Sequence, residues 1–257
     1  MPENDLSLLI KAGQEAGEIA ASYCGRDPKI WNKDDNAGPV TEADLAANAH
    51  LEAVLKTAQP DYGWLSEESE DTAARLSTKR QFVIDPIDGT RAFIEGSKDW
   101  AVSLAIVEDG TPIAGVVVMP RRGATYAAQR GGGATLNGEA LRVSTQTDIN
   151  NASVLTNKIT MQADHWKGGA APGFKRTFRS SLAFRMCLVA QGRFDAMMTL
   201  RPTWEWDIAA GAIIIAEAGG TVTDRKGGAL RLNNAHPQVD GIVASGVLHG
   251  TLAQALR

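Results

Sequence analysis

The segment DPIDGT, residues 85–90, places two carboxylates three residues apart in a stretch that also carries proline and glycine. The apolar run before it, residues 81–84, predicts a buried strand that leads directly into Asp85. Two like charges at this spacing repel each other unless a cation lies between them. Magnesium prefers carboxylate and carbonyl oxygens. The segment is therefore a candidate magnesium site, with Asp85, Asp88 and the Ile87 carbonyl as ligands.

Aspartate is also common in turns and helix caps, and the pair alone fits that interpretation. Two further stretches favour chemistry. WLSEESE places Glu67 and Glu68 directly after an apolar strand, so that one could face a cleft and the other solvent, and WEWDIAAG places Asp207 in the first turn of an apolar helix. Gly89 permits close approach of a ligand to the backbone. Thr90 is expected to begin a short helix whose free amides suit a phosphate.

The elements that must position these residues are predicted from apolar periodicity and turn residues. In the first half we expect helices over 5–23 and 42–58, a polar loop over 25–39, strands over 62–65 and 81–84, and a hairpin over 100–120 that turns at Asp109-Gly110. In the second half we expect strands near 153–156, 194–199, 221–224 and 241–245, and helices near 181–191, 206–218 and 247–256. The glycine run 131–133 is interpreted as a bulged turn, because no Lys-Ser/Thr follows it. We expect two α/β lobes, residues 1–148 and 149–257, that form one compact catalytic unit around one cleft.

Composition and charge narrow the class of protein. The 257 residues are 44% hydrophobic and 22% charged, which is ordinary for a globular protein. A net charge of −4 argues against a broad face for a nucleic acid polymer. Cys24 and Cys187 are too few for a disulfide framework, and no signal peptide or membrane-spanning run is visible. We therefore expect a cytoplasmic protein with no membrane partner.

The motifs GPVTEAD, LSEES, DPIDGT, WDIAAG and EAGG occur in that order along most of the chain. Together they resemble the inositol monophosphatase family of magnesium-dependent, lithium-sensitive phosphatases. The resemblance implies an α/β (α+β) fold, a layered αβαβα sandwich of the inositol monophosphatase and fructose bisphosphatase type. It also implies an active site between the lobes, two or three Mg²⁺ ions per site, a small phosphate ester as substrate, and a homodimer.

The same resemblance assigns the metal ligands residue by residue. Glu67, the first member of the family's glutamate pair, would bind one metal. Asp85 would bridge two metals, and Ile87 would contribute its carbonyl oxygen. Asp88 would hold the second metal, and Asp207 would complete that site.

The resemblance also assigns groups that act on the phosphate and on the attacking water. Asp88, Gly89 and Thr90 match the phosphate-binding turn. Glu67 and Thr90 would position the water, with Asp44 supporting the threonine. The spacing of Thr41 and Asp44 also predicts a helix capping box, and both roles are compatible.

Two alternatives concern the chemistry itself. In the first, Asp85 is a nucleophile, as in haloacid-dehalogenase-like phosphatases, although their Asp-x-Asp-x-Thr spacing is one residue shorter than the spacing here. In the second, the chain is a regulatory or binding member of the family without catalysis. The intact set of ligand positions argues against the second alternative.

The substrate is predicted from RSSLAFRMCLVAQG, in which Arg185 lies two residues before Cys187. The 3′(2′),5′-bisphosphate nucleotidases carry a lysine at a similar place, and a guanidinium there could bind a second phosphate. We therefore expect hydrolysis of phosphoadenosine phosphate to AMP. An inositol 1-phosphatase or a histidinol-phosphate-type phosphatase is the alternative, and an Arg185 exposed on the helix surface would remove the argument.

Overall fold

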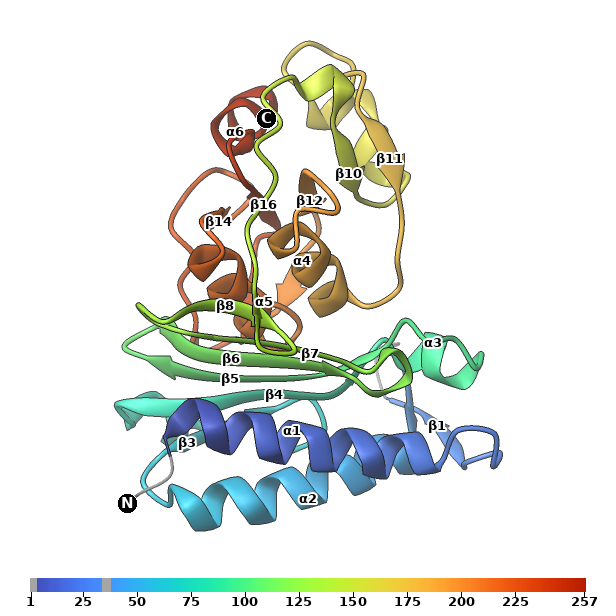
Figure 1. Cartoon of the computed structure of the whole chain (residues 1–257), viewed down its shortest axis with the longest axis vertical. Helices are drawn as coiled ribbons and strands as arrows, with labels where there is room; N and C mark the ends of the chain where they lie inside the picture. The colour runs from blue at the N-terminus through green and yellow to red at the C-terminus, as the bar shows by residue number, and fades with distance from the viewer. Residues whose placement is uncertain (1–3, 34–37) are drawn as a thin grey trace.

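The computed structural model describes residues 4–33 and 38–257, which form five stacked layers (Figure 1). Helices α1 (Asp5–Ser22) and α2 (Glu42–Ala58) cover one face of a seven-stranded sheet. Helices α4 (Leu182–Ala190) and α5 (Glu205–Glu217) lie between this sheet and a five-stranded sheet, and α6 (His249–Ala255) covers the second sheet. The expected αβαβα fold is confirmed.

The first sheet has the strand order β3-β4-β5-β6-β7-β8-β9. Its strands are β3 (Gly63–Ser66), β4 (Arg80–Asp88), β5 (Ala101–Glu108), β6 (Thr111–Met119), β7 (Ala124–Gln129), β8 (Gly133–Leu136) and β9 (Glu139–Ala140). β3 runs parallel to β4, and the other neighbours are antiparallel. The predicted hairpin turn is confirmed, since Asp109 and Gly110 both have positive φ, 50° and 76°, as a two-residue turn of this hand requires.

Both faces of the first sheet are buried, which explains its nearly continuous apolar strands. On β4, Phe82 and Ile84 join the core under α1 and α2, while Val83 joins the core shared with α4 and α5. The period of two along the strand therefore sends Asp85, like Val83, toward α5.

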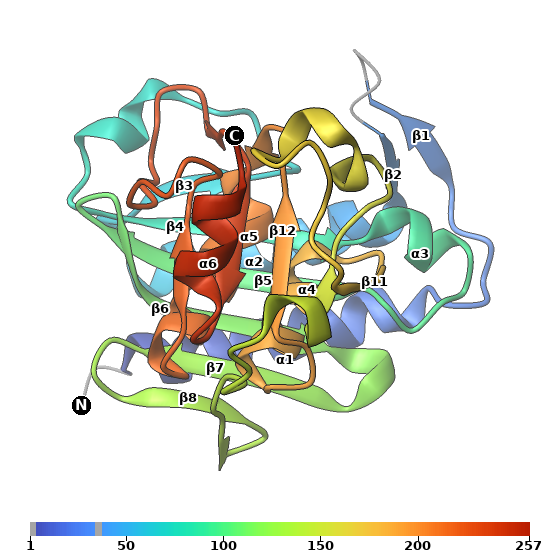
Figure 2. The same ribbon diagram turned by 90° about the horizontal axis from the view of Figure 1, so that it is seen from above.

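The second sheet has the order β11-β10-β12-β16-β14. Its strands are β10 (Ser153–Leu155), β11 (Lys175–Thr177), β12 (Ala196–Thr199), β14 (Thr221–Thr223) and β16 (Ile242–Ser245). Seen from above, this sheet and α6 lie over the first sheet (Figure 2). The predicted strands and helices of the second half agree with the structure to within two residues.

The structure adds short elements that the sequence patterns did not indicate. They are the pairs β1 (Ile30–Asn32)/β2 (Pro39–Thr41) and β13 (Thr203–Trp204)/β15 (Gln238–Val239), the strand β11, and the 3₁₀ turns η2 (Ala73–Ser77), η3 (Pro120–Arg122), η4 (Ile149–Asn151), η5 (Ile159–Met161) and η6 (Ala163–His165). The short helix expected from Thr90 is present as α3 (Thr90–Ile94). The predicted loop over 25–39 is wrong where β1 and β2 pair, and its residues 34–37 lie outside the described part of the chain. Strands of two or three residues are too short to show alternation, which is why they were missed.

The glycine run forms the predicted turn between β7 and β8. Gly131 and Gly133 have φ of 74° and 78°, and their amides donate to the Glu217 carboxylate at 2.9 and 2.8 Å. The turn is thus fixed to the end of α5.

One apolar core contains residues of both sheets together with α4 and α5. The division into lobes at residue 148 stays a prediction, although the strands of the two sheets do separate near it. Among the described residues, no helix combines the length and the apolar character that crossing a bilayer requires.

Candidate active site

The two aspartates of β4 face the same side because the strand contains a β-bulge. Asp85 pairs with Ser103 and Asp88 pairs with Ala101, so Pro86 and Ile87 together oppose a single residue of β5. Three residues apart would normally mean opposite faces, and the extra residue restores the same face. Proline suits the bulge because it has no amide hydrogen to lose from the ladder. Ser103 donates to the Trp206 carbonyl, so this face is the one toward α5.

Three carboxylates from three different elements meet on that face. Glu67 follows β3, Asp85 lies on β4 and Asp207 is in the first turn of α5. One oxygen from each lies within 4.8 Å of the others. The residues are 18 and 122 positions apart along the chain, so only the packing of α5 on the first sheet brings the set together.

Burial and mutual repulsion oppose the ionised forms of these carboxylates, which favours binding of a cation between them. Burial raises the pKa of Asp85 well above its ordinary value, and the charges of Glu67, Asp88 and Asp207 raise it further. Burial likewise raises the pKa of Asp207, with Asp88 and Glu67 adding to the shift. Anionic oxygens at this separation suit a hard divalent cation, so the donor set fits magnesium.

Asp88 lies beside this set but outside it. Its Oδ2 accepts from the Ser181 hydroxyl and from the Ala183 amide, both at 2.6 Å, at the start of α4. Burial raises the pKa of Asp88, while these hydrogen bonds oppose the shift. One carboxylate oxygen is therefore committed to α4, and Oδ1 is the oxygen left for the predicted metal contact.

Thr90 and Asp44 are in contact, as the family resemblance implied. The Thr90 hydroxyl lies 3.2 Å from Asp44 Oδ1 and 3.1 Å from the Ile87 carbonyl oxygen, which are alternative acceptors for its single hydrogen. Asp44 Oδ2 accepts from the amide and hydroxyl of Thr41 at 2.8 and 2.6 Å, which completes the predicted capping box. Asp44 therefore caps α2 and orients Thr90 with the same carboxylate. Gly89, at the start of α3, has a φ of 101° that strongly favours glycine.

Lys33 is a site residue that the sequence patterns did not indicate. Its Nζ lies 2.7 Å from Glu67 Oε1 and 2.6 Å from Glu68 Oε1. Glu68 does not face solvent, because its side chain is only 5% exposed, and burial together with Glu67 raises its pKa to about 7. The expectation that the second glutamate of the pair faces solvent is wrong. A lysine in a polar segment gives no local sign of a partner 34 residues away.

The carboxylates line a cleft of about 780 Å³. Its wall includes Asn157, Phe178, Arg185, Arg201 and Trp204. Arg201 and Trp204 were not predicted. Both lie just before α5, where no helical or strand pattern marks them.

Arg185 is buried rather than exposed on the surface of α4, so the surface alternative is wrong. Its Nε donates to the Arg179 carbonyl at 2.5 Å, and one Nη donates to the Ser180 carbonyl at 3.3 Å. Its guanidinium carbon lies 4.4 Å from the centre of the Phe178 ring. Burial lowers its pKa to about 10, which leaves it charged at neutral pH. Much of its hydrogen-bonding capacity therefore holds the segment before α4.

Comparison with known proteins gives the family. The model of the inositol monophosphatase family matches residues 1–257. The chain belongs to the inositol monophosphatase family. An inositol-1-monophosphatase of Rhizobium meliloti (strain 1021) is 33% identical over 263 residues, which cover 98% of this chain and 94% of that protein.

Other relatives in the family carry different names. The Nus factor SuhB of Pseudomonas aeruginosa is 35% identical over 250 residues, covering 90% of this chain and 89% of that protein. Among solved structures, the IMPase of Thermotoga maritima has a TM-score of 0.82 and 30% identity, covering 97% of this chain and 95% of that one. The family match and the shared fold therefore extend along nearly the whole chain.

Proposed function

We propose that this protein hydrolyses a small phosphate monoester with water, in a reaction that depends on magnesium. The observation that carries the proposal is that ligand oxygens of Glu67, Asp85 and Asp207 lie within 4.8 Å of one another in the lining of the cleft. Divalent cations held there would neutralise the charge of the phosphate and lower the pKa of the attacking water. Membership of the family favours this chemistry over a covalent Asp85 intermediate.

The side chains around the cluster have separate tasks in this proposal. Glu67, Asp85 and Asp207 hold the cations, with Asp88 Oδ1 and the Ile87 carbonyl as further ligands. Thr90, oriented by Asp44, and Glu67 position the water. The Gly89 and Thr90 amides bind the phosphate.

For the substrate, we propose a nucleotide with two phosphates, such as 3′-phosphoadenosine 5′-phosphate. The support is the wall of the cleft, where Arg185 and Arg201 provide positive charge and Phe178 is 48% exposed. An aromatic ring in this place offers a surface for a base, and an arginine offers paired donors for a second phosphate. Because Arg185 is engaged with its own segment, Arg201 is the better candidate for direct contact.

Inositol 1-phosphate is the second candidate. The observation in its favour is that relatives covering nearly the whole chain, including the one from Rhizobium meliloti, are named inositol-1-monophosphatase. Only the nucleotide carries a second phosphate, so a contact of Arg185 or Arg201 with that phosphate distinguishes the two candidates.

A panel of phosphate esters with measurement of released phosphate tests both levels. In magnesium, we expect turnover of 3′-phosphoadenosine 5′-phosphate to exceed that of 3′-AMP, inositol 1-phosphate and histidinol phosphate. Excess chelator should abolish turnover, and added magnesium should restore it. No turnover of any ester would favour a regulatory or binding role without catalysis.

Replacement of Arg201 tests the second-phosphate contact. A lost charge-assisted hydrogen bond is worth roughly 1.5–3 kcal/mol, or about ten- to a hundred-fold in kcat/KM. Arg201→Ala should lose this factor on 3′-phosphoadenosine 5′-phosphate but not on 3′-AMP, and Arg201→Lys should recover part of it. Arg193→Ala, an exposed arginine away from the cleft wall, is the control. Equal losses on both nucleotides would leave inositol 1-phosphate as the better candidate.

A further inference from the structure

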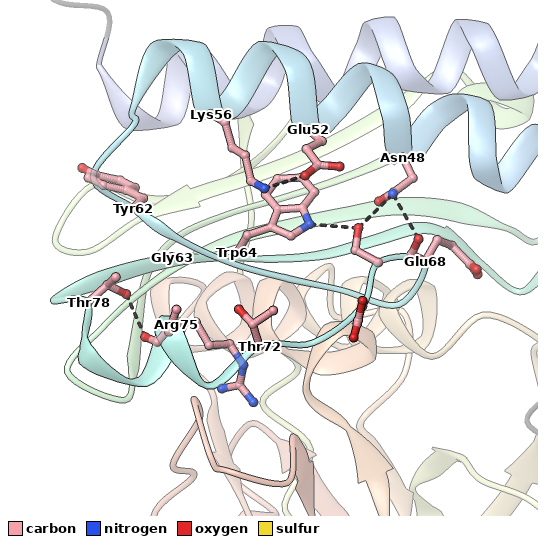
Figure 3. Close-up of a pocket in the computed structure, with 13 residues that line it drawn as sticks. Asn48, Glu52, Lys56, Tyr62, Gly63, Trp64, Glu68, Thr72, Arg75 and Thr78 are labelled. Atoms are coloured by element: carbon pink, nitrogen blue, oxygen red, sulfur yellow. Dashed lines mark hydrogen bonds and ion pairs between the residues drawn. The ribbon is translucent and has the colours of Figure 1, made fainter.

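Behind the Glu67 turn lies a second pocket, of about 600 Å³, between α2, β3 and the segment 68–78 (Figure 3). At one end of it, Asn48 extends from α2 toward the turn that follows β3. Glu68 and Ser69 line this pocket, whereas Glu67, in the same turn, lines the cleft that contains the candidate metal site.

Asn48 holds this turn at three points. Its Oδ1 accepts from the Ser66 hydroxyl at 2.7 Å, and its Nδ2 donates to the Ser69 hydroxyl at 3.0 Å and to the Glu68 carbonyl at 3.3 Å. Asn48 is only 7% exposed and uses both ends of its amide, so its orientation is fixed. The contacted residues lie on both sides of Glu67, and Glu67 itself is not among them.

The neighbouring contacts strengthen the same turn. The Trp64 indole N–H also donates to the Ser69 hydroxyl, at 3.0 Å, and the Glu67 amide donates to the Ile84 carbonyl, at 3.1 Å. With the residues before and after it anchored, the Glu67 backbone retains little freedom. This fixes the point from which its side chain extends, and from there a carboxylate oxygen lies within 4.8 Å of ligand oxygens of Asp85 and Asp207.

The position of Asn48 on α2 connects it to the other half of the site. Asp44 lies four residues earlier, and residues four apart share a helix face. Asp44 contacts Thr90, as described above, while Asn48 contacts the Glu67 turn. One face of α2 therefore aligns both groups that the proposed function uses to position water.

We propose that Asn48 is a positioning residue, which sets the Glu67 carboxylate in register with Asp85 and Asp207 for cation binding. The proposal rests on the proposed metal-dependent function but is independent of which ester is hydrolysed. Residues that orient metal ligands typically change metal affinity or activity by about 10- to 100-fold when they are replaced.

Calorimetric titration of the metal-free protein with magnesium tests this proposal without measuring turnover. Asn48→Leu, which keeps the number and branching of the side-chain heavy atoms but removes all three hydrogen bonds, should weaken magnesium binding by about 10-fold or more. Glu52→Gln is the matched control on the same face of α2, because Glu52 contacts Lys56 and not the turn. It should bind magnesium as wild type does.

A second pair of variants separates positioning from general stability. Ser69→Ala removes the hydroxyl that Asn48 and Trp64 share, at a half-buried loop position, and should weaken magnesium binding several-fold. Leu9→Ala removes core volume on α1 and should lower the melting temperature without changing magnesium affinity. If Asn48→Leu does not fold, Ser69→Ala decides alone.

The outcomes are distinct. Wild-type affinity in Ser69→Ala, or in a folded Asn48→Leu protein, would overturn the positioning role. Failure of the wild-type protein itself to bind magnesium would instead overturn the proposed function. Weakened binding in the Asn48 and Ser69 variants, with both controls unchanged, would support the proposal.

Discussion

At the scale of single residues, the main feature is a set of acids that oppose one another. Asp85 is only 1% exposed, and its raised pKa is caused first by burial and then by the charges of Glu67, Asp88 and Asp207. An acid whose folded pKa is raised binds more protons folded than unfolded, so the metal-free protein loses stability as pH rises above the ordinary aspartate value. Function and stability conflict at this position until a cation is bound.

This conflict predicts that Asp85→Asn stabilises the metal-free protein while it removes activity. At pH 8 the free energy of unfolding should rise by roughly 1–3 kcal/mol, within the range of single substitutions, or about 2–4 °C in Tm per kcal/mol. Thermal melts in chelator, at pH 5 and pH 8, measure the change, and the wild-type protein should lose more stability between the two. Asp61→Asn, at an exposed turn, is the control. A lower Tm for Asp85→Asn at pH 8 would show that repulsion is not dominant.

At the scale of elements, local patterns predicted most helices and strands because their apolar period persists for several residues. The capping box at Thr41 and Asp44 and the turn at Asp109-Gly110 could be predicted from the sequence, because each depends on residues that are close together in the chain. The bulge in β4 was only partly readable, since Pro86 marks an irregularity but the pairing with β5 sets the face of Asp88.

The contacts that the sequence could not give are those between distant segments. Lys33 with Glu67 and Ser181 with Asp88 join residues 34 and 93 positions apart. Ser181 is the N-cap of α4, and nothing in the neighbouring sequence indicates that its hydroxyl also binds Asp88. Family motifs identified the carboxylates themselves, whereas the residues that orient them required the folded structure.

Asp195 provides a prediction at this scale, because its carboxylate joins the loop after β9 to the start of β10. It accepts from the Ser144 hydroxyl at 2.5 Å and from the amide and hydroxyl of Ser153 at 2.6 and 2.8 Å. Burial raises its pKa, but these hydrogen bonds outweigh burial, and the net pKa is lowered. A lowered folded pKa contributes stability above the ordinary aspartate value, which disappears as pH falls through the folded value.

Asp195→Ala should therefore destabilise the protein by roughly 1–3 kcal/mol at pH 7. The difference from wild type should shrink as pH falls below about 4. Urea unfolding at pH 7 and at progressively lower pH measures it, with the exposed Asp164→Ala as control. A difference that is constant with pH would mean that packing, and not the charge of Asp195, is responsible.

At the scale of the whole molecule, the site depends on how the two sheets are held together. Arg75 of η2, only 2% exposed, connects the segment between β3 and β4 to the loop between β14 and β15. Its guanidinium donates to Asp71 at 2.6 and 2.8 Å, to Asn233 Oδ1 at 2.6 Å and to the Asn234 carbonyl at 2.9 Å. The backbone amides of Asn233 and Asn234 in turn donate to the Glu205 carboxylate, at 2.7 and 2.9 Å. Glu205 begins α5, two residues before Asp207, so this chain of contacts sets where α5 starts relative to the first sheet.

Arg75→Met should consequently weaken both stability and the metal site. Loss of the hydrogen bonds that the buried Arg75 guanidinium makes costs roughly 1–3 kcal/mol, which corresponds to about 2–4 °C in Tm per kcal/mol. Magnesium affinity should also fall, because Asp207 is no longer held in register with Asp85. A double-mutant cycle with Glu205→Gln should give a coupling energy within about 0.5–3 kcal/mol, while Lys79→Met, an exposed cation nearby, should change neither quantity. Unchanged magnesium affinity in a destabilised Arg75→Met protein would mean that α5 is positioned by its apolar packing alone.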